Sequence, residues 1–344
     1  MKALYYETFS GPVAVADVPT PGVPDGGALI RVGASGLCRS DWHAWAGHDD
    51  TVHLPHVPGH EFAGVVEAVG AGVERWRPGD RVTAPFVNGC GHCEWCRSGQ
   101  AQVCPDQTQP GFTHWGSHAE LVAVRAADLN LVALPEGLPD AAAAALGCRF
   151  ATAYRALTAR AGLQAGEWVA VYGAGGVGLS AIAIARALGA RPIAVDRSPA
   201  ALEAAARIGA EHTLLAGPHA ADAVAELTSG GAHVAVDAVG SASTAVAGVR
   251  SLRRRGRHVQ IGLLSGDLPV LPLDRVIAWE LDVLGSHGMA AADYPGMLAL
   301  VASGDLRPDQ LVGRTVGLAE AARLLPMTDA APSTGITVLD PTMA

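Results

Sequence analysis

Apolar residues follow two different patterns along the chain, and the change comes near residue 149. Before it, short runs that suit β-strands at residues 28–36, 64–72 and 80–87 are broken by glycine and proline. After it, strand-like apolar runs alternate with alanine-rich stretches of helix length. The first pattern predicts an irregular β domain, and the second predicts an α/β domain with a parallel, doubly wound sheet.

The sheet of the second region is expected to hold six strands within residues 149–286. The first is Trp168–Tyr172, and the second runs from Pro192 to Asp196. Four more come from the segments "HTLLA", "HVAVDAVG", "RHVQIGLL" and "LDVLGSHG". Between the two regions, "DAAAAALG" predicts a helical crossover.

Composition supports a folded protein of two domains. The chain has 344 residues, 49% of them hydrophobic and 17% charged, which is too long for one core of usual size and too apolar for a disordered chain. Its net charge of -9 argues against nucleic-acid and anionic-membrane partners. The one basic run, residues 253–257, precedes a strand-like stretch and is interpreted as a solvated turn.

Targeting signals are not expected. The N-terminal "MKALYYETFS" has no apolar core of a signal peptide, which favours a cytoplasmic, reducing location. The most lipid-like window, Val169 to Ala190, is interrupted by five glycines and by Arg186. It therefore predicts a strand and a buried helix rather than a membrane span.

Four of the six cysteines lie together in one polar, glycine-containing loop. Cys90, Cys93, Cys96 and Cys104 form a C-x2-C-x2-C-x7-C pattern, which can close a tetrahedral shell around a structural zinc ion. One alternative is an iron–sulfur cluster, but such clusters usually have about three residues between the third and fourth cysteines, whereas this loop has the longer x7 spacing. The other alternative is a set of unliganded thiols.

The other two cysteines, Cys38 and Cys148, flank "PGHEFAG", which contains His60 and Glu61. Two thiolates and one imidazole would make a zinc site with an open fourth position, as a catalytic zinc requires. Taken singly, each cysteine could equally be a small buried apolar residue.

A dinucleotide-binding pattern follows the strand Trp168–Tyr172. The segment "GAGGVG", residues 173–178, gives G-x-G-x-x-G between a strand and a helix, with the acidic Asp196 about twenty residues further on. The first glycine makes the turn, the second admits a pyrophosphate and the third allows close helix–strand packing. Asp196 can accept hydrogen bonds from the adenosine ribose.

These segments together resemble the zinc-dependent medium-chain alcohol dehydrogenases of the medium-chain dehydrogenase/reductase superfamily. The family's order and spacing are kept in "GLCRSDWH", "PGHEFAG", "GDRV", the four-cysteine loop, "LGCRFATAY", "VYGAGGVG" and "GITVLD". The resemblance implies a mostly-β GroES-like catalytic domain at 1–148 with a structural zinc lobe at about 88–106. It further implies a Rossmann domain at 149–286 and a C-terminal return to the catalytic domain at 287–344.

The resemblance also implies which residues surround the catalytic zinc. Cys38, His60 and Cys148 are the expected ligands, with Glu61 as an occasional alternative ligand. Asp41 is expected to orient His60 through its other ring nitrogen. Without the family pattern, Asp41 would equally suit a helix N-cap.

Further roles are implied for the proton path and the two bound molecules. Ser40 and His43 resemble a proton relay through the cofactor ribose, although His43 alone would suit an ordinary surface residue, and Arg39 resembles a pyrophosphate contact. The other expected cofactor contacts are Gly173, Gly175, Gly176, Val177, Gly178, Asp196, Arg197, Thr152, Val239, Ile261, Gly262 and Leu263. Trp42, Trp45, Phe86 and Trp115 are the expected substrate-pocket residues, though aromatic residues there would also suit ordinary core.

The implied function is hydride transfer between an alcohol and NAD, with two zinc ions per chain, in a homodimer or homotetramer. A zinc-free quinone or enoyl reductase would not need Cys38, His60 and Cys148, and a structural or redox-sensing protein would not need Ser40 and His43. Relatives that act on polyols or threonine often have a carboxylate at the position of Cys148, so simple alcohols, aldehydes and ketones are favoured as substrates. One departure is Ile336, where many relatives carry a basic residue that contacts the cofactor phosphate.

Overall fold

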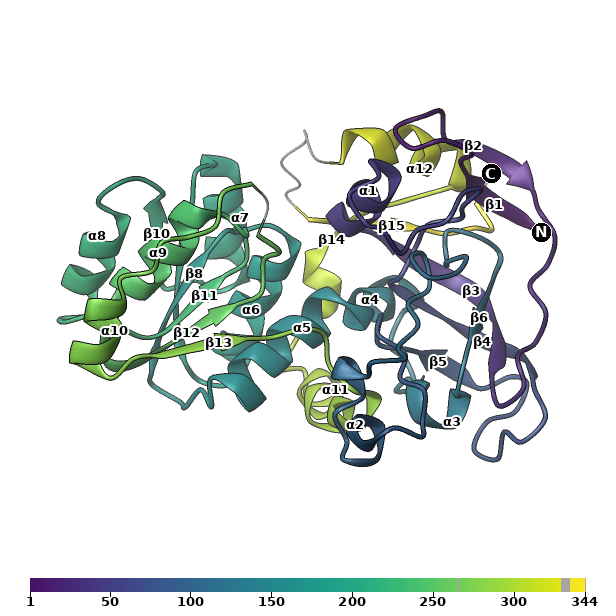
Figure 1. The fold of residues 1–344 in the computed structure, drawn as a ribbon, viewed down its shortest axis with the longest axis horizontal. Coiled ribbons are helices and arrows are strands. Elements are labelled where there is room, and N and C mark those ends of the chain that lie inside the picture. The colour runs from purple at the N-terminus through teal and green to yellow at the C-terminus, as the bar shows by residue number, and fades with distance from the viewer. Residues whose placement is uncertain (265, 329–334, 344) are drawn as a thin grey trace.

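The computed structural model describes residues 1–264, 266–328 and 335–343, which form two lobes joined by helices (Figure 1). One lobe is built on a six-stranded sheet. The other is built on a seven-stranded sheet and carries both ends of the chain (Figure 1).

The six-stranded sheet is parallel throughout, with strand order β10-β9-β8-β11-β12-β13. Its strands are Trp168–Tyr172 (β8), Arg191–Asp196 (β9), His212–Leu215 (β10), Ala232–Asp237 (β11), Leu252–Gln260 (β12) and Asp282–Gly285 (β13). The strand order reverses between β8 and β11, and in such sheets ligands bind at the carboxyl ends of the strands at this point. The expected doubly wound sheet of six strands is confirmed.

Helices connect successive strands of this sheet. They are Gly176–Ala187 (α6), Pro199–Ile208 (α7), Ala220–Leu227 (α8), Ala242–Arg250 (α9) and Leu273–Trp279 (α10). Local signals explain their limits. For example, Ser198 caps α7 by accepting a hydrogen bond from the Ala201 amide at 3.3 Å, and Gly209 ends it with a φ of 119°.

The basic run lies inside β12, so its interpretation as a turn before the strand was wrong. The pairing with β11 jumps from Ala232–Leu252 to Val234–Arg257, and Arg255 has a φ of 61°. This irregularity leaves three of the arginines exposed, as a solvated segment would be, while the strand continues.

The second sheet combines strands from the two ends of the chain. Its order is β14-β15-β3-β4-β5-β7, with β6 also paired to β3, and β1 and β2 form a separate hairpin-like pair. The strands are Lys2–Tyr5 (β1), Ala14–Asp17 (β2), Ala28–Leu37 (β3), Phe62–Val69 (β4), Arg81–Thr83 (β5), Leu121–Val124 (β6), Val132–Ala133 (β7), Val312–Val316 (β14) and Ile336–Leu339 (β15). Because β15 runs antiparallel to β3, the C-terminal segment completes the sheet that the N-terminal segment begins.

The remaining helices flank this sheet or join the lobes. They are Arg39–Trp45 (α1), Glu94–Arg97 (α2), Ala127–Asn130 (α3), Asp140–Ala144 (α4), Arg149–Arg155 (α5), Tyr294–Ser303 (α11) and Leu318–Leu324 (α12). Short 3₁₀ turns occupy Ala101–Val103, Ala145–Gly147, Ala291–Asp293, Pro308–Leu311 and Leu325–Met327, and α5 continues into a π-helical turn at Ala156–Arg160. The helical crossover expected at residues 140–147 is therefore present as α4 and the turn after it.

One hydrophobic core runs through both lobes. It contains Leu146 and Phe150 near the crossover, Ile182 on α6, Tyr294 on α11 and Val338 on β15, all of them fully buried. The junction between the lobes is thus packed like a domain interior.

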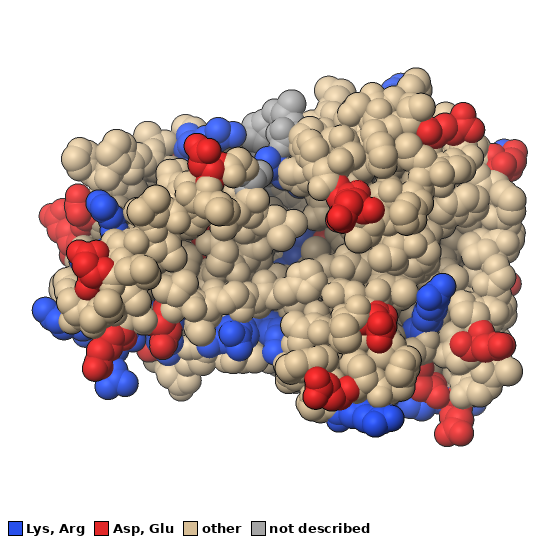
Figure 2. Space-filling view, in the orientation of Figure 1, with Lys and Arg blue, Asp and Glu red and all other residues tan. Residues whose placement is uncertain are grey.

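Charged residues of both signs are scattered over the face in Figure 2, with no large region of one sign. Within the three described stretches of the chain, no helix has both the length and the apolar content needed to cross a bilayer.

Candidate active site and metal centres

The first part of the site is the tight connection between β3 and α1. Cys38 precedes the helix, and its amide donates to Asp41 Oδ2 at 2.7 Å, which closes the first turn. Asp41 is completely buried. It therefore fixes the backbone from which the Cys38 thiol projects.

Asp41 also holds His60. Its Oδ1 lies 2.9 Å from His60 Nδ1 and accepts from the Gly59 amide at 3.2 Å. His60 is 1% exposed, and its other ring nitrogen, Nε2, has no hydrogen-bond partner among the described residues. An imidazole held at one nitrogen and unpaired at the other is the usual arrangement of a metal-ligating histidine.

The unpaired nitrogen lies among other candidate metal ligands. One donor atom each from Cys38, His60, Glu61 and Cys148 lies within 4.8 Å of the others. A hydrogen bond with Cys148 holds the pKa of the Cys38 thiol well below its usual range, which favours the thiolate that binds metal. These residues fit a zinc ion bound by two thiolates and one imidazole.

His118 also approaches Asp41 and was not anticipated from the sequence. Its Nε2 lies 3.5 Å from Asp41 Oδ2, and its Nδ1 is 2.8 Å from Ser35 Oγ. Burial alone would raise the pKa of Asp41, but His60 and His118 hold it well below its usual range. No pattern marked this lone histidine, since only the fold brings it to the site.

A second unanticipated residue is Arg149, which directly follows Cys148. Its side chain is 6% exposed, and its Nε lies 3.2 Å from Oε1 of the fully buried Glu61. Burial raises the pKa of Glu61 to about 8, against the lowering effect of Arg149. The only signal in the sequence was the position of Arg149 beside a candidate ligand.

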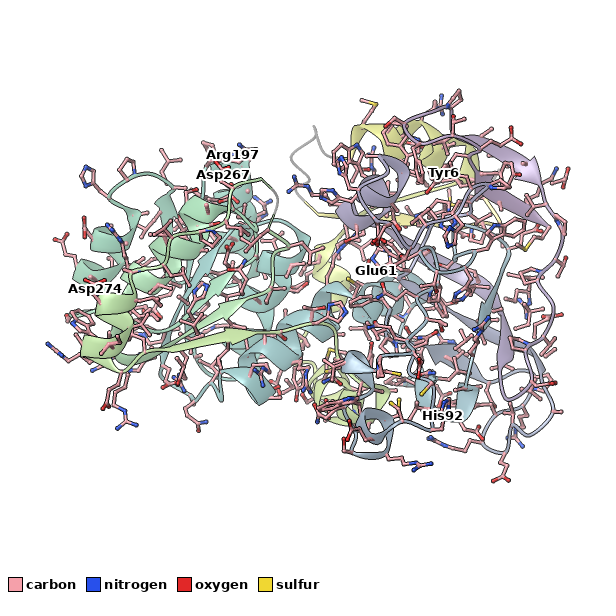
Figure 3. The ribbon with its side chains drawn as sticks, in the orientation of Figure 1. Tyr6, Glu61, His92, Arg197, Asp267 and Asp274 are labelled. Carbon is pink, nitrogen blue, oxygen red and sulfur yellow. The ribbon has the colours of Figure 1, made fainter. Side chains whose placement is uncertain are left out.

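The four-cysteine loop forms a separate candidate metal centre. Cys90 Sγ and Cys96 Sγ are 4.0 Å apart, and Cys93 Sγ and Cys104 Sγ are 3.7 Å apart. Sulfurs bound tetrahedrally at about 2.3 Å from one zinc would be about 3.8 Å from one another. Figure 3 shows that His92, in this loop, lies far from Glu61 near the junction of the lobes.

Backbone amides hold two of the cysteine sulfurs of this loop. The Cys90 amide donates to Cys104 Sγ and the Cys96 amide donates to Cys93 Sγ, both at 3.4 Å. Burial alone would raise the pKa of Cys90, but the amides of His92 and Cys93 lower it to about 6. The amides therefore favour the thiolate of Cys90, whereas burial raises the pKa of Cys96 to about 12 and also raises that of Cys104.

Replacing Cys93 with serine is expected to lower the melting temperature by about 5 °C and to remove one of two zinc ions, because a closed zinc site contributes folding free energy directly. Calorimetry and metal analysis measure both effects. Ser98→Ala, a change in the same loop at an exposed hydroxyl, is the matched control. An unchanged melting temperature with two zinc ions retained would contradict the assignment of this loop.

The candidate relay residues project from α1. Ser40 Oγ lies 3.8 Å from Cys38 Sγ, and His43 stands one helical turn further along, on the same side of the helix. His43 Nδ1 is 3.0 Å from Nδ1 of His48, an exposed residue that the sequence had not indicated. The Trp42 ring packs edgewise on both imidazoles, with centroids 4.9 and 5.4 Å away.

Aromatic rings surround His60, but only one of them was anticipated. The centroid of the Phe86 ring is 6.1 Å from that of His60 and 5.3 Å from that of His287. Phe112, which the sequence did not single out, is closer to His60, at 5.3 Å. Phe112 and His287 come from distant segments, so no local spacing could indicate them.

The two other expected pocket residues, Trp45 and Trp115, are held by hydrogen bonds to backbone carbonyls. The Trp45 indole donates to the Gly11 carbonyl at 2.9 Å, and the Trp115 indole donates to the Pro55 carbonyl at 3.1 Å. Trp115 also packs edgewise on Tyr5, with ring centroids 6.3 Å apart. Of the expected aromatic residues, the structure thus brings Phe86 to the candidate ligand cluster and Trp42 to His43 and His48.

The glycine-rich loop leads from β8 into α6. Gly173 has a φ of 94°, and a Cβ on Gly178 would lie 1.8 Å from the Gly173 carbonyl oxygen, so no side chain fits at 178. A Cβ on Gly175 would meet nothing within 4 Å. The space over Gly175, at the N-terminus of a helix, fits a dinucleotide pyrophosphate.

Asp196 closes β9 and braces this loop. Its Oδ2 accepts from the Ala174 amide at 2.7 Å and its Oδ1 from the Ser198 amide at 2.8 Å. Its exposed neighbour Arg197 lies on the lobe of the six-stranded sheet (Figure 3). A carboxylate with remaining acceptor capacity is therefore held beside the loop.

The other expected cofactor contacts lie at the ends of neighbouring elements. Val239 lies against Gly173, since a Cβ there would be 2.6 Å from Val239 Cγ2. The remaining positions are Gly176 and Val177 at the start of α6, Arg39 at the start of α1, Thr152 on α5, and Ile261, Gly262 and Leu263 directly after β12. They come from both lobes.

Comparisons with known proteins agree with this architecture. Residues 24–136 match the family described as "Alcohol dehydrogenase GroES-like domain", and residues 176–303 match "Zinc-binding dehydrogenase". An alcohol dehydrogenase of Geobacillus stearothermophilus is 36% identical over 313 residues, which is 89% of this chain and 90% of that protein.

Solved structures resemble the whole chain. A structure described as an NAD-dependent alcohol dehydrogenase has a TM-score of 0.90 and 32% identity, covering 99% of each chain. Alcohol dehydrogenase TADH from Thermus sp. ATN1 also has a TM-score of 0.90, with 35% identity and 99% of each chain covered.

Proposed function

Because this chain belongs to the zinc-dependent medium-chain alcohol dehydrogenase family, we propose specific catalytic roles for the residues gathered around His60. The protein is an NAD- and zinc-dependent oxidoreductase that interconverts alcohols with aldehydes or ketones. What remains to be assigned is which residues perform each step and which alcohols fit.

The unpaired His60 Nε2 within the Cys38, Cys148 and Glu61 cluster carries the assignment of the catalytic metal. Cys38, His60 and Cys148 hold the catalytic zinc, with Glu61 as the alternative ligand, and Asp41 orients His60. The second zinc is held by the four cysteines of the loop, Cys90, Cys93, Cys96 and Cys104.

When bound, zinc acts as a Lewis acid that makes an alcohol hydroxyl more acidic, and NAD accepts the hydride. The chain's own residues move the proton. Ser40 Oγ, beside the ligand Cys38, accepts the hydroxyl proton while it releases its own, and His43, one helical turn away, receives the released proton and passes it towards the exposed His48 and solvent. The aromatic rings of Phe86 and Phe112 beside His60 keep water from the reacting carbon.

The glycine-rich loop and Asp196 bind NAD in this proposal. Gly175 leaves room for the pyrophosphate, and Asp196 accepts from the adenosine ribose. The division into a catalytic domain at 1–148, a Rossmann domain at 149–286 and a returning segment at 287–344 belongs to the same proposal, as does assembly into dimers or tetramers.

The ring walls around His60 favour alcohols with apolar or aromatic substituents over polyols. Screening primary, secondary, aromatic and diol substrates with NAD, followed by NADH absorbance, tests both the function and this preference. We expect the fastest turnover with apolar alcohols. Failure of the zinc-loaded protein to form NADH from any of them would contradict the function, and a preference for diols would contradict the substrate class.

His43→Gln is expected to reduce alcohol oxidation about tenfold near neutral pH and less at alkaline pH, because water and hydroxide can partly replace the lost proton acceptor. His48→Gln should have a smaller effect. Steady-state rates across a pH series measure both. His219→Gln, at a side chain that is 92% exposed on the other lobe, is the control. Unchanged rates for His43→Gln throughout the series would exclude the relay.

A further inference from the structure

Arg149 is a buried cation for which the reaction scheme above has no use. It is the first residue of α5 and is 5% exposed. Its Nε faces Glu61 Oε1 at 3.2 Å, and its Nη2 donates to the Leu37 carbonyl at the end of β3. Since guanidinium groups remain protonated in proteins, a permanent positive charge is fixed next to the metal ligands.

The same side chain lies against the glycine-rich loop. A Cβ on Gly176, the first residue of α6, would be 2.7 Å from Arg149 Cδ and 3.1 Å from its Nε. Only a glycine at 176 therefore allows the arginine to lie where it does. The adjacent Gly175 borders open space, so the guanidinium stands beside the backbone that is shaped for a phosphate.

The position of Arg149 also bears on Ile336. Leu37, whose carbonyl Arg149 holds, pairs with Thr337 in the β3–β15 register, so the guanidinium lies near the start of β15. Ile336 is apolar and 2% exposed, so it offers no charge to a ligand there. At this place in the fold the positive charge therefore comes from Arg149 on α5 and not from residue 336 on β15.

We propose that Arg149 is a cofactor-binding residue that adds a positive charge to the dinucleotide pyrophosphate subsite, besides that of the expected contact Arg39, and joins that subsite to the metal site through Glu61. The proposal rests on the assignment of the glycine-rich loop to NAD. A helix N-terminus offers only about half a unit charge to a pyrophosphate that carries about two negative charges, so a fixed guanidinium beside it adds a major part of the attraction.

The test is ligand binding by the zinc-loaded protein, measured by calorimetry for NADH, ADP-ribose and adenosine. In Arg149→Gln we expect Kd to rise roughly tenfold to a hundredfold for NADH and ADP-ribose, which contain the pyrophosphate, and to stay unchanged for adenosine. The salt dependence of NADH binding should also become weaker. Arg155→Gln is the matched control, because Arg155 is a buried arginine of the same helix that pairs with Asp293 at 2.8 Å.

Two results with Arg149→Gln would overturn the proposal. One is an NADH affinity in the folded variant equal to that of the unmodified protein, and the other is an equal loss of affinity for adenosine, which would show a purely structural role.

If Arg149→Gln does not fold, Gly176→Ala provides a second variant, which keeps the buried charge but displaces Arg149 from the loop. A selective loss for NADH with weaker salt dependence then supports the proposal, whereas unchanged affinity or a loss with unchanged salt dependence contradicts it. If the unmodified protein binds no NADH, the cofactor assignment itself fails; if it binds NADH as tightly as its variants do, only the role of Arg149 fails.

Discussion

His60→Ala is expected to reduce turnover about a thousandfold or more, because loss of Lewis-acid assistance removes several kcal/mol of transition-state stabilisation and about 4 kcal/mol corresponds to roughly a thousandfold. The buried carboxylate of Asp41, 2.9 Å from His60 Nδ1, fixes the orientation of this ligand. Metal analysis should find one zinc ion per chain instead of two. NADH affinity should stay within about threefold of the unmodified protein, since the glycine-rich loop lies on the other lobe.

The alanine variant leaves Asp41 buried without its main partner, so a second variant guards against a folding defect. Cys38→Ser keeps the Asp41–His60 contact and removes only a ligand sulfur, and we expect a comparable loss of turnover. His53→Ala, at an exposed histidine of the same lobe, serves as the control. Near-normal turnover in a His60→Ala protein that lacks the zinc ion at the Cys38, His60 and Cys148 site would rule out Lewis-acid catalysis there.

The unmodified protein is expected to use NAD at least a hundredfold more efficiently than NADP, as measured by kcat/KM. At about 4 Å and an effective dielectric near 20, a phosphate charge against the Asp196 carboxylate costs on the order of 4 kcal/mol before screening. The neighbouring Arg197 could offset part of this repulsion by holding the phosphate.

Asp196 also holds the Ala174 and Ser198 amides, so its replacement has two effects that must be separated. Asp196→Gly should narrow or reverse the NAD preference but also weaken binding of both cofactors, since the loop loses its brace. Asp196→Asn keeps one oxygen acceptor and removes the charge, so it should narrow the preference with a smaller loss of affinity. Adding Arg197→Ala to either Asp196 variant should cancel the increase in kcat/KM for NADP. Equal use of NAD and NADP by the unmodified protein would show that Asp196 lacks this role.

The α/β fold could be predicted because its signals are local. Strand Trp168–Tyr172, the glycines at 173, 175 and 178, and Asp196 follow one another at spacings that few other structures require. The same holds for the four-cysteine loop. The bulge in β12 escaped prediction because its cause is the pairing with β11, and local sequence does not show which strand lies alongside.

The sequence by itself determined the chemistry: which side chains can bind zinc, which loop can receive a pyrophosphate, and which carboxylate can select NAD. Only the tertiary structure decided what surrounds them. His118 reaches Asp41 from beyond the four-cysteine loop, and Phe112 and His287 approach His60 and Phe86 from distant segments. Arg149 became significant only when folding placed it between Glu61 and Gly176. The physical reason is that a ligand set needs particular atoms at short spacings, which a sequence displays, whereas burial, charge pairing and ring packing depend on segments that meet only when the chain has folded.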